Sequence, residues 1–395
     1  MENVVILEGA RSPIGKFLGA YKDTPAVDLG VLATTEALRR AAVEPGQIEE
    51  FVYGHARQAG NGPNGARQVS YKSGIPQEVT AYTVNMACAS GSKSVEMAAA
   101  RIALGQAEIT AAGGMENMTQ VPFLLPKMRL GYRMGDAPAV DAMYADGFTC
   151  RLCGLVMGET AENLARQYDI SREEQDEFAL TSQRKAEAGK AKRAAEMFDV
   201  EVPGKKRGTT DTMTEDEHPR ADSSMESLGK LPPVFADEAE GGTVTAGNSS
   251  GITDGAASLV LMSEARAKAE GREPLAKIVA VASAGVDPTI MGIAPVPATK
   301  KVLEQTGLTL TDFDVVEINE AFAAQVLACD RELKFDHDKL NVNGGAIAIG
   351  HPIGMSGARI ILAAAYEMRD KGYSLGLATL CVSGGQGMSV VLERI

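Results

Sequence analysis

The sequence predicts an α/β fold in which helices cover a sheet. Short apolar runs typical of strands alternate with amphipathic stretches through much of the chain, which is the pattern of an α/β architecture. One α/β unit also occurs twice: residues 89–114 and 355–385 each run from Ser-Gly through a long alanine-rich helix and an apolar strand to Gly-Gly. We therefore expect an internal duplication, with each Ser-Gly at a helix start and each Gly-Gly at a strand end.

The individual elements follow from hydrophobic periodicity. Apolar runs predict strands at 3–8, 109–112, 276–284, 315–318 and 376–381. Apolar residues that recur three and four positions apart predict helices at 28–42, 90–104, 171–195 and 356–369. The third of these helices begins with "SREEQ", an N-cap serine followed by acidic residues that suit the positive end of a helix dipole.

Residues 119–248 differ from the two repeated units. They carry more charge and proline, a methionine-rich segment and a turn-rich run. We interpret them as an inserted region of mixed structure that serves substrate coverage or subunit contact. Within it, the "GKKRG" run at 204–208 is interpreted as a solvated hairpin rather than a phosphate clamp.

Composition excludes several classes of protein. With 395 residues, 45% of them hydrophobic and 23% charged, the chain is long enough for a large core. A net charge of -13 argues against binding to nucleic acid or an anionic membrane surface. We expect no membrane span, because no apolar run is long enough. An odd number of cysteines and the lack of a signal peptide at the start predict a reducing, cytoplasmic location.

Three familiar motifs are discounted. "GNGPNG" at 60–65 fits a dinucleotide fingerprint, but "GHARQA" before it looks too polar for the buried strand that the fingerprint needs, so we expect a glycine-rich helix entry. "GNSSG" at 247–251 fits a serine-hydrolase elbow, but no strong helix follows Ser249. Cys150 and Cys153 have the spacing of half a zinc site, but no second pair exists. We expect no metal.

Four stretches carry candidate reactive residues. "NMACASG" places Cys88 among small residues at a helix start, and "VVEINEAFAAQ" ends a strand at Asn319. "GGAIAIGHPIGMSGAR" holds His351 in a glycine-rich run, and "LCVSGGQG" places Cys381 at the end of an apolar strand. Each alone is compatible with packing or a capped turn. Together they supply two thiols, an amide and an imidazole at glycine-rich element ends, in a chain with only four histidines and five cysteines.

These four blocks, in this order and at these separations, resemble the signature blocks of the thiolases, the acetyl-CoA C-acyltransferases. The resemblance runs essentially from end to end. It implies two duplicated βαβαβαββ halves in a five-layered αβαβα arrangement, with an inserted loop domain. The implied N-terminal half is 1–118 completed by 249–270, the loop domain for coenzyme A (CoA) binding and oligomerisation is 119–248, and the C-terminal half is 271–395.

The resemblance also implies roles for the candidate residues. Cys88 is the nucleophile that takes the acyl group, and His351 is the base that accepts its proton. Cys381 exchanges a proton with C2 of acetyl-CoA. One oxyanion hole uses His351 and a water held by Asn319, and the other uses the backbone N–H groups of Cys88 and Ser383. Placement at a helix N-terminus beside a base is expected to lower the Cys88 pKa.

The binding residues are implied in the same way. The CoA contacts match Arg220, Ser227 and Ser250. The acyl pocket matches Met157, Met291 and Phe322. Val156 stands where relatives often have a histidine, which weakens the transfer of contacts at that point.

The implied reaction is the reversible Claisen condensation of two acetyl-CoA to acetoacetyl-CoA plus CoA, with CoA thioesters as substrates and no permanently bound cofactor. One alternative is cleavage of longer 3-ketoacyl-CoA in β-oxidation, which the same signature residues fit. An alternative of another class is a catalytically silent CoA-binding subunit. "TQVPFLLPKMRL" at 119–130 and its sequel match the family's tetramerisation loop, which implies a homotetramer that is a dimer of dimers.

Overall fold

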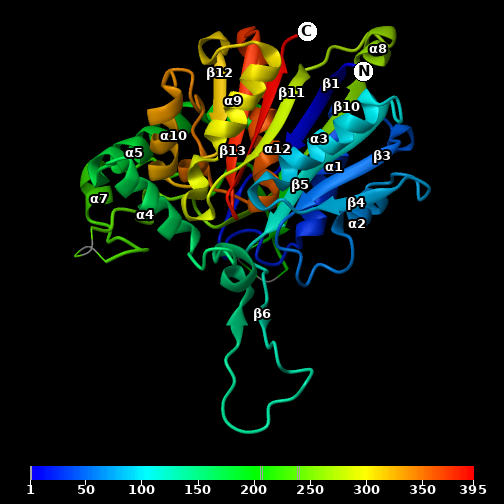
Figure 1. Ribbon diagram of the computed structural model, residues 1–395. Helices are drawn as coiled ribbons and strands as arrows, with labels where there is room; N and C mark the ends of the chain where they lie inside the picture. Colours follow the sequence, from blue (N-terminus) through cyan, green and yellow to red (C-terminus); the bar gives the residue numbers. More distant parts are fainter. Residues whose placement is uncertain (1, 205, 207, 238, 240) are drawn as a thin grey trace.

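The fold is centred on one large mixed sheet (Figure 1). The computed structural model describes residues 2–204, 206, 208–237, 239 and 241–395. The ten-stranded sheet has the order β12-β13-β14-β11-β1-β10-β5-β3-β4, with β2 paired to β10. Its strands are β1 Val4–Arg11, β2 Gly15–Lys16, β3 Glu50–His55, β4 Ala81–Val84, β5 Ile109–Asn117, β10 Thr253–Ser263, β11 Ala276–Gly285, β12 Val315–Ile318, β13 Leu375–Val382 and β14 Gln386–Glu393.

Twelve α-helices surround this sheet or extend from it in the described residues. They are α1 Ala26–Arg40, α2 Gly65–Lys72, α3 Ser90–Ala103, α4 Met157–Gln167, α5 Arg172–Ala188, α6 Lys190–Glu196, α7 Met225–Gly229, α8 Glu264–Ala269, α9 Pro295–Thr306, α10 Ala323–Leu333, α11 Ala346–Ile349 and α12 Ile353–Lys371. Two short hairpins lie outside the sheet: β6 Phe123–Leu124 with β7 Val140–Asp141, and β8 Val200–Pro203 with β9 Thr210–Met213.

The strand pairing confirms the duplication. In the first half β1 is antiparallel to β10, β10 is antiparallel to β5, and β5 is parallel to β3. In the second half β11 is antiparallel to β14, β14 is antiparallel to β13, and β13 is parallel to β12. The halves meet where β1 pairs antiparallel with β11.

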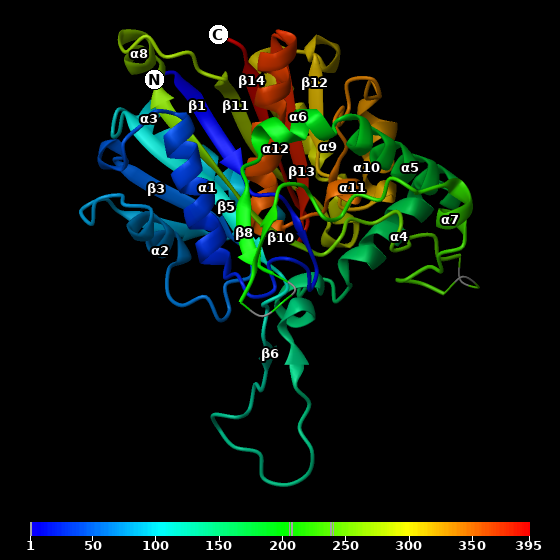
Figure 2. The same cartoon turned by 180° about the vertical axis from the view of Figure 1, so that it is seen from behind.

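The strands of the N-terminal half and the strands of the C-terminal half form two of the expected five layers, and helices form the other three. α3 and α12 pack on each other in the middle, and α12 contacts strands of both halves. α1 covers the outer face of β1, β5 and β10, and α9 covers β11 and β14 (Figures 1 and 2). Side chains along β1 show the consequence, because successive residues point to opposite faces: Val4 and Ile6 join the core beside α12, whereas Val5 and Leu7 join the core beside α1.

All five predicted strands are present, and three of the four predicted helices have the expected extent to within three residues. The helix predicted at 171–195 is instead two helices, α5 and α6. They meet at Gly189, where a Cβ atom would lie 2.7 Å from the Cα of Asn343. Close packing against the C-terminal half therefore coincides with the break in the helix.

The argument that "GHARQA" is too polar to supply a buried strand was wrong for its first two residues, because Gly54 and His55 end β3, which is buried along its whole length. The polar residues of β3 have partners that the local sequence does not reveal: Nε2 of His55 lies 3.3 Å from Oε1 of Glu116, and Glu50 accepts a hydrogen bond from Arg101. The expected helix entry is confirmed: α2 begins at Gly65, and the side chain of Asn64 accepts a hydrogen bond from the backbone N–H of Arg67.

The region 119–248 contains two hairpins outside the large sheet, of which β8–β9 packs on the body of the molecule through Val200, Val202 and Met213. The loop between β6 and β7 extends away from the body of the molecule (Figure 1). The β8–β9 hairpin encloses the 204–208 run, of which Lys205 and Arg207 lie outside the described residues. Across the described ranges, no helix is both long and apolar enough to cross a membrane. The same ranges hold no cluster of three or more His, Cys, Asp or Glu residues arranged to bind a metal ion.

Candidate active site

Both halves and the inserted region contribute to one cavity of about 360 Å³. Cys88 enters it from the turn before α3, His351 from the turn before α12, and Cys381 from the end of β13. The starts of the two repeated helices thus lie at one cavity, together with the end of β13. Ligands of α/β proteins commonly bind at such strand ends. The expectation that Gly113 and Gly114 stand at a strand end was wrong, because β5 continues past them to Asn117.

The turn that carries Cys88 is held in a strained conformation. Ala87 has a φ of +42°, in the left-handed region that favours glycine. Ser90 stabilises this turn, because its Oγ accepts a hydrogen bond from the backbone N–H of Met86 at 2.9 Å and donates one to the carbonyl of Ala87 at 2.7 Å. The side chain of Asn85 accepts a bond from the N–H of Ala87 at 3.0 Å. The turn directs the Cys88 thiol into the cavity at the start of α3.

The protonation state of Cys88 differs from our expectation. Burial raises the pKa of the Cys88 thiol above its ordinary value, although a backbone hydrogen bond from Ser383 and the charge of Arg57 act in the opposite direction. Desolvation outweighs this hydrogen bond and charge, so the expected lowering of the Cys88 pKa was wrong. Cys88 is therefore a neutral thiol that needs a base.

His351 is arranged as that base. Its Nδ1 lies 2.6 Å from Oγ of Ser356, and that hydroxyl donates to the carbonyl of Pro352 at 2.9 Å. Since the hydroxyl proton is used, Oγ accepts from Nδ1–H, which leaves Nε2 as a hydrogen-bond acceptor. Burial lowers the pKa of His351 to about 3, so the ring is neutral near pH 7. Gly350 precedes it with a φ of +102°, and a Cβ there would lie 2.4 Å from Thr253.

Asn319 and Cys381 complete the group of four. Asn319 follows β12, is fully buried, and its Nδ2 donates toward Nε2 of His351 at 3.4 Å. It is not itself at the cavity surface. Cys381 is fully buried, and burial raises its pKa well above the ordinary value. The structure therefore brings all four predicted catalytic residues together, with Ser383 beside them.

Glu320, next to Asn319, positions the surrounding loops. Its carboxylate accepts hydrogen bonds from Ser182 Oγ at 2.6 Å, Asn341 Nδ2 at 2.7 Å and the backbone N–H of Ile347 at 3.1 Å. Ser182 belongs to α5 of the inserted region, and Ile347 to the α11 turn that precedes His351. The buried carboxylate thus fixes the His351 loop against the inserted region.

The predicted binding residues fall into two adjoining cavities. Met157, Met291 and Phe322 all line the catalytic cavity, as do Arg220 and Ser250. The other cavity, of about 200 Å³, is lined by Ser227 and shares His218, Arg220 and Ala246 with the first. A long ligand can therefore extend from Cys88 past Ser250 to Ser227.

Several cavity residues were missed from the sequence. His218 lines both cavities, and its Nδ1 donates to the carbonyl of Ala348 at 2.9 Å. Phe235 packs edge-on against Phe322, with ring centroids 6.0 Å apart. Arg57 and the π-helical turn Tyr144–Phe148 complete the wall beside Cys88. No motif or periodicity marked these positions.

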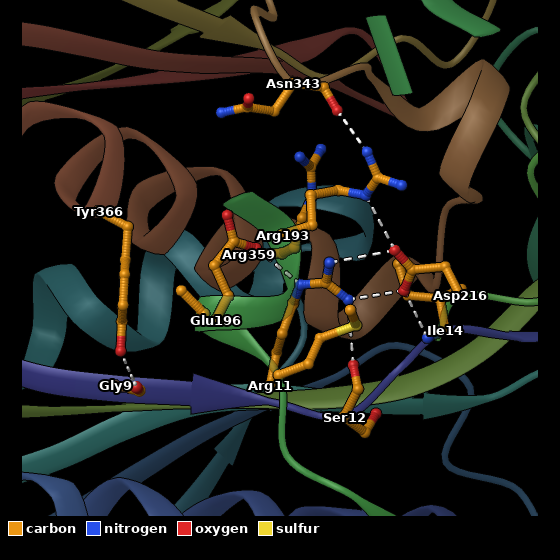
Figure 3. Close-up of polar contacts among 12 residues, drawn as sticks. Gly9, Arg11, Ser12, Ile14, Arg193, Glu196, Asp216, Asn343, Arg359 and Tyr366 are labelled. Atoms are coloured by element: carbon orange, nitrogen blue, oxygen red, sulfur yellow. Dashed lines mark hydrogen bonds and ion pairs between the residues drawn. The ribbon is translucent and has the colours of Figure 1, made fainter. Parts of the chain in front are cut away.

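A buried ionic network anchors the segment that carries His218 and Arg220 (Figure 3). Arg11, at the end of β1, binds Glu196 at 2.8 Å and Asp216 at 2.7 Å. Asp216 also contacts Arg193 at 3.2 Å, and Arg193 donates to the carbonyl of Asn343 at 2.8 Å. Although burial alone would raise it, the charge and hydrogen bonds of Arg11 lower the pKa of Asp216. The network therefore connects β1, α6 and the C-terminal half to Asp216, which lies two residues before His218 in the chain.

Comparisons with known proteins agree with this geometry. Residues 4–265 match the N-terminal domain of thiolase, and residues 272–394 match its C-terminal domain. An acetyl-CoA acetyltransferase of Escherichia coli is 50% identical, with 100% of both chains covered. The crystal structure of the Bacillus anthracis acetyl-CoA acetyltransferase is 44% identical with a TM-score of 0.96, covering 100% of this chain and 99% of the other. Human mitochondrial 3-ketoacyl-CoA thiolase is 40% identical with a TM-score of 0.94, at the same coverage. The chain belongs to the thiolase family.

Proposed function

We propose that this protein is an acetyl-CoA C-acetyltransferase, which condenses two acetyl-CoA to acetoacetyl-CoA and CoA through an acyl group on Cys88. The observation that supports this most directly is the convergence of Cys88, His351 and Cys381 on one cavity that opens toward Arg220. The names of the full-length relatives in Escherichia coli and Bacillus anthracis agree with the proposal.

In the first half-reaction Nε2 of His351 takes the Cys88 proton as the sulfur attacks the thioester carbonyl. The imidazolium then donates its new N–H to the developing oxyanion, and Asn319 is adjacent to stabilise it. Burial disfavours the thiolate of Cys88 and the imidazolium of His351, so attack and proton transfer are expected to be coupled. The C–S bond of acetyl-CoA breaks as the thiol of Cys381 protonates the departing sulfur, so CoA leaves as the thiol, acetyl-Cys88 remains and Cys381 becomes the thiolate.

In the second half-reaction Cys381 removes a proton from C2 of a second acetyl-CoA. The resulting carbanion attacks acetyl-Cys88, the C–C bond of acetoacetyl-CoA forms, and the bond between Cys88 and the acyl carbon breaks as His351 returns its proton to the Cys88 sulfur. The N–H of Ser383, which bonds the Cys88 thiol in the resting site, is placed to stabilise the oxyanion on this intermediate. The raised pKa of Cys381 in the resting site means that it is a thiol until substrate binds.

The test is incubation with acetyl-CoA followed by peptide mass spectrometry. We expect one acetyl adduct on Cys88, its loss in Cys88→Ser, and its retention in Cys381→Ala, which should no longer form acetoacetyl-CoA. Cys329→Ala is the matched control, because Cys329 is a buried cysteine outside the cavity. Absence of the adduct from the folded wild-type protein would favour a silent CoA-binding subunit instead.

Chain-length preference separates acetyltransfer from degradation of longer substrates. We propose the short-chain activity, which predicts that kcat/KM for thiolysis falls from four-carbon to eight- and sixteen-carbon linear 3-ketoacyl-CoA. A flat or rising profile would indicate β-oxidative cleavage. We further propose a cytoplasmic homotetramer that uses CoA thioesters without a permanently bound cofactor.

A further inference from the structure

Arg57 places an unpaired cation at the wall of the catalytic cavity. It follows β3 and lines the cavity together with Cys88 and Cys381. Only 7% of the residue is exposed. Arginines this deeply buried are normally paired, but no carboxylate of the described residues forms an ion pair with Arg57, and its Nε is buried without any hydrogen-bond partner.

The nearby acid does not neutralise the guanidinium directly. Oε1 of Glu116 accepts the backbone N–H of Arg57 at 3.0 Å and lies 3.3 Å from Nε2 of His55. Oε2 of Glu116 accepts the N–H of Gly354 at 2.9 Å. Both oxygens of Glu116 therefore accept hydrogen bonds from backbone N–H groups. The charge on the side chain of Arg57 lacks a bonded counter-ion.

The local backbone leaves room for the guanidinium. A Cβ atom on Gly147 would lie 2.6 Å from Nε of Arg57, so the glycine permits the close approach of the Tyr144–Phe148 turn. Arg57 does not line the neighbouring cavity that contains Ser227. The unpaired charge thus lies at the reactive end of the ligand path rather than at its nucleotide end.

We propose that Arg57 binds a carboxylate on the acyl chain, so that between 3-oxoacyl-CoA substrates of equal length the enzyme favours the one whose acyl group ends in a carboxylate. The proposal rests on the proposed thiolase function and concerns which longer acyl chains that site accepts beside the four-carbon substrate. A carboxylate can accept two parallel hydrogen bonds from one guanidinium, and such charge-assisted pairs are strong where water is excluded. An anionic acyl end would supply the counter-ion that the folded chain does not.

The reaction of such a substrate needs no additional reactant. Cys88 sulfur attacks C3, the C2–C3 bond breaks, and C2 takes a proton from Cys381 to give acetyl-CoA. The ω-carboxyacyl group remains on Cys88 until the thiol of CoA displaces it. One ω-carboxy-3-oxoacyl-CoA and one CoA therefore give acetyl-CoA and an ω-carboxyacyl-CoA that is two carbons shorter.

The first test compares two substrates of equal length on the wild-type protein. The probes are the CoA monothioester of 3-oxohexanedioic acid, with the 3-oxo group next to the thioester arm, and 3-oxohexanoyl-CoA. We expect kcat/KM to be at least tenfold higher for the carboxylated probe, although the protein is acidic overall. A ratio of one or less would overturn the proposal.

The second test asks whether Arg57 causes the preference. Arg57→Met should lower the ratio of the two kcat/KM values about 30-fold or more, and Arg57→Lys should lower it less. Arg166→Met removes an exposed arginine of α4 and should leave the ratio unchanged. If Arg57→Met slows both probes equally, the guanidinium acts on the Cys88 thiol rather than on the substrate, and the proposal fails.

Two further readouts separate the possible failures. Acetylation of Cys88 by acetyl-CoA is measured in the same preparation: an adduct together with a ratio of one or less overturns only the Arg57 proposal, whereas no adduct overturns the proposed function. If Arg57→Met does not fold, inhibition of the wild type by the monothioester of butanedioic acid is compared with inhibition by butanoyl-CoA. Tighter inhibition by the carboxylated compound supports the proposal, and equal or weaker inhibition contradicts it.

Discussion

Burial sets the ionisation of the reacting residues in the catalytic cavity. The pKa of His351 is lowered to about 3 and that of Cys88 is raised, in both cases chiefly because desolvation disfavours the charged form. At a pH above the pKa of His351 and below the pKa of Cys88, the site contains a neutral imidazole and a neutral thiol. This is the pair from which coupled proton transfer and attack begin.

The acylation rate should therefore be nearly independent of pH. We expect the single-turnover rate constant for acetylation of Cys88 by acetyl-CoA to change less than about threefold between pH 5.5 and 8. The reason is that His351 loses its proton far below this range, whereas an ordinary histidine titrates near pH 6.5. Rapid-quench mass spectrometry measures the rate. An acid limb with a tenfold rise per pH unit up to about pH 6.5 would show that His351 titrates normally. His337→Gln, an exposed histidine bound to Asp330, should leave the profile unchanged.

Sequence reasoning selected residues that the structure brings to one cavity, but it did not predict their environment. Cys88, His351 and Cys381 could be proposed because they occur together at glycine-rich element ends in the order of the thiolase blocks, although each alone is compatible with packing. Arg57 could not, since its importance comes from a cavity formed by segments distant in the chain. The direction of the Cys88 pKa shift was missed for a similar reason, because desolvation depends on tertiary packing.

At the level of elements, helix boundaries follow local chemistry closely. α1 ends in a Schellman motif: the N–H of Val43 donates to the carbonyl of Leu38, and the N–H of Ala42 donates to that of Arg39. α3 ends in the same way, with Gln106 donating to Arg101 and Gly105 to Ile102. The two helices differ at the left-handed position, which is Ala42 with φ +48° in α1 and Gly105 with φ +68° in α3.

This difference predicts opposite effects of two reciprocal substitutions. Ala42→Gly should raise the free energy of unfolding by about 1 kcal/mol, because glycine adopts the left-handed conformation without the Cβ clash. Gly105→Ala should lower it by a similar amount. An added Cβ on Gly105 would have no heavy atom of another residue within 4 Å, so the effect would be conformational alone. Urea denaturation followed by circular dichroism at 222 nm measures both, since the chain lacks tryptophan. Shifts of the same sign would contradict this explanation.

On the scale of the whole molecule, duplication and insertion together create the active site. Each half supplies one helix start, a division that the repeated sequence pattern could predict. The inserted region is tied to both halves by buried polar groups, through Asp216 to Arg11 and through Ser182 to Glu320. Such long-range pairs have no signal in the local sequence, and this is why the role of the 216–220 segment emerged only from the fold.

The projecting loop between β6 and β7 should hold the proposed tetramer together. Leu130 and Met134 are 89% and 95% exposed at residues that extend from the body of the molecule. Apolar side chains gathered on such a projection are typical of an interface between subunits. Replacing both by serine should convert tetramers to dimers in sedimentation velocity without lowering the unfolding midpoint of the subunit, because neither side chain packs on the subunit body. Leu104→Ser, an equally apolar exposed position at the end of α3, is the control and should leave the mass unchanged. A double variant that remains tetrameric, or a wild-type protein that is never tetrameric, would show that this loop does not join the dimers.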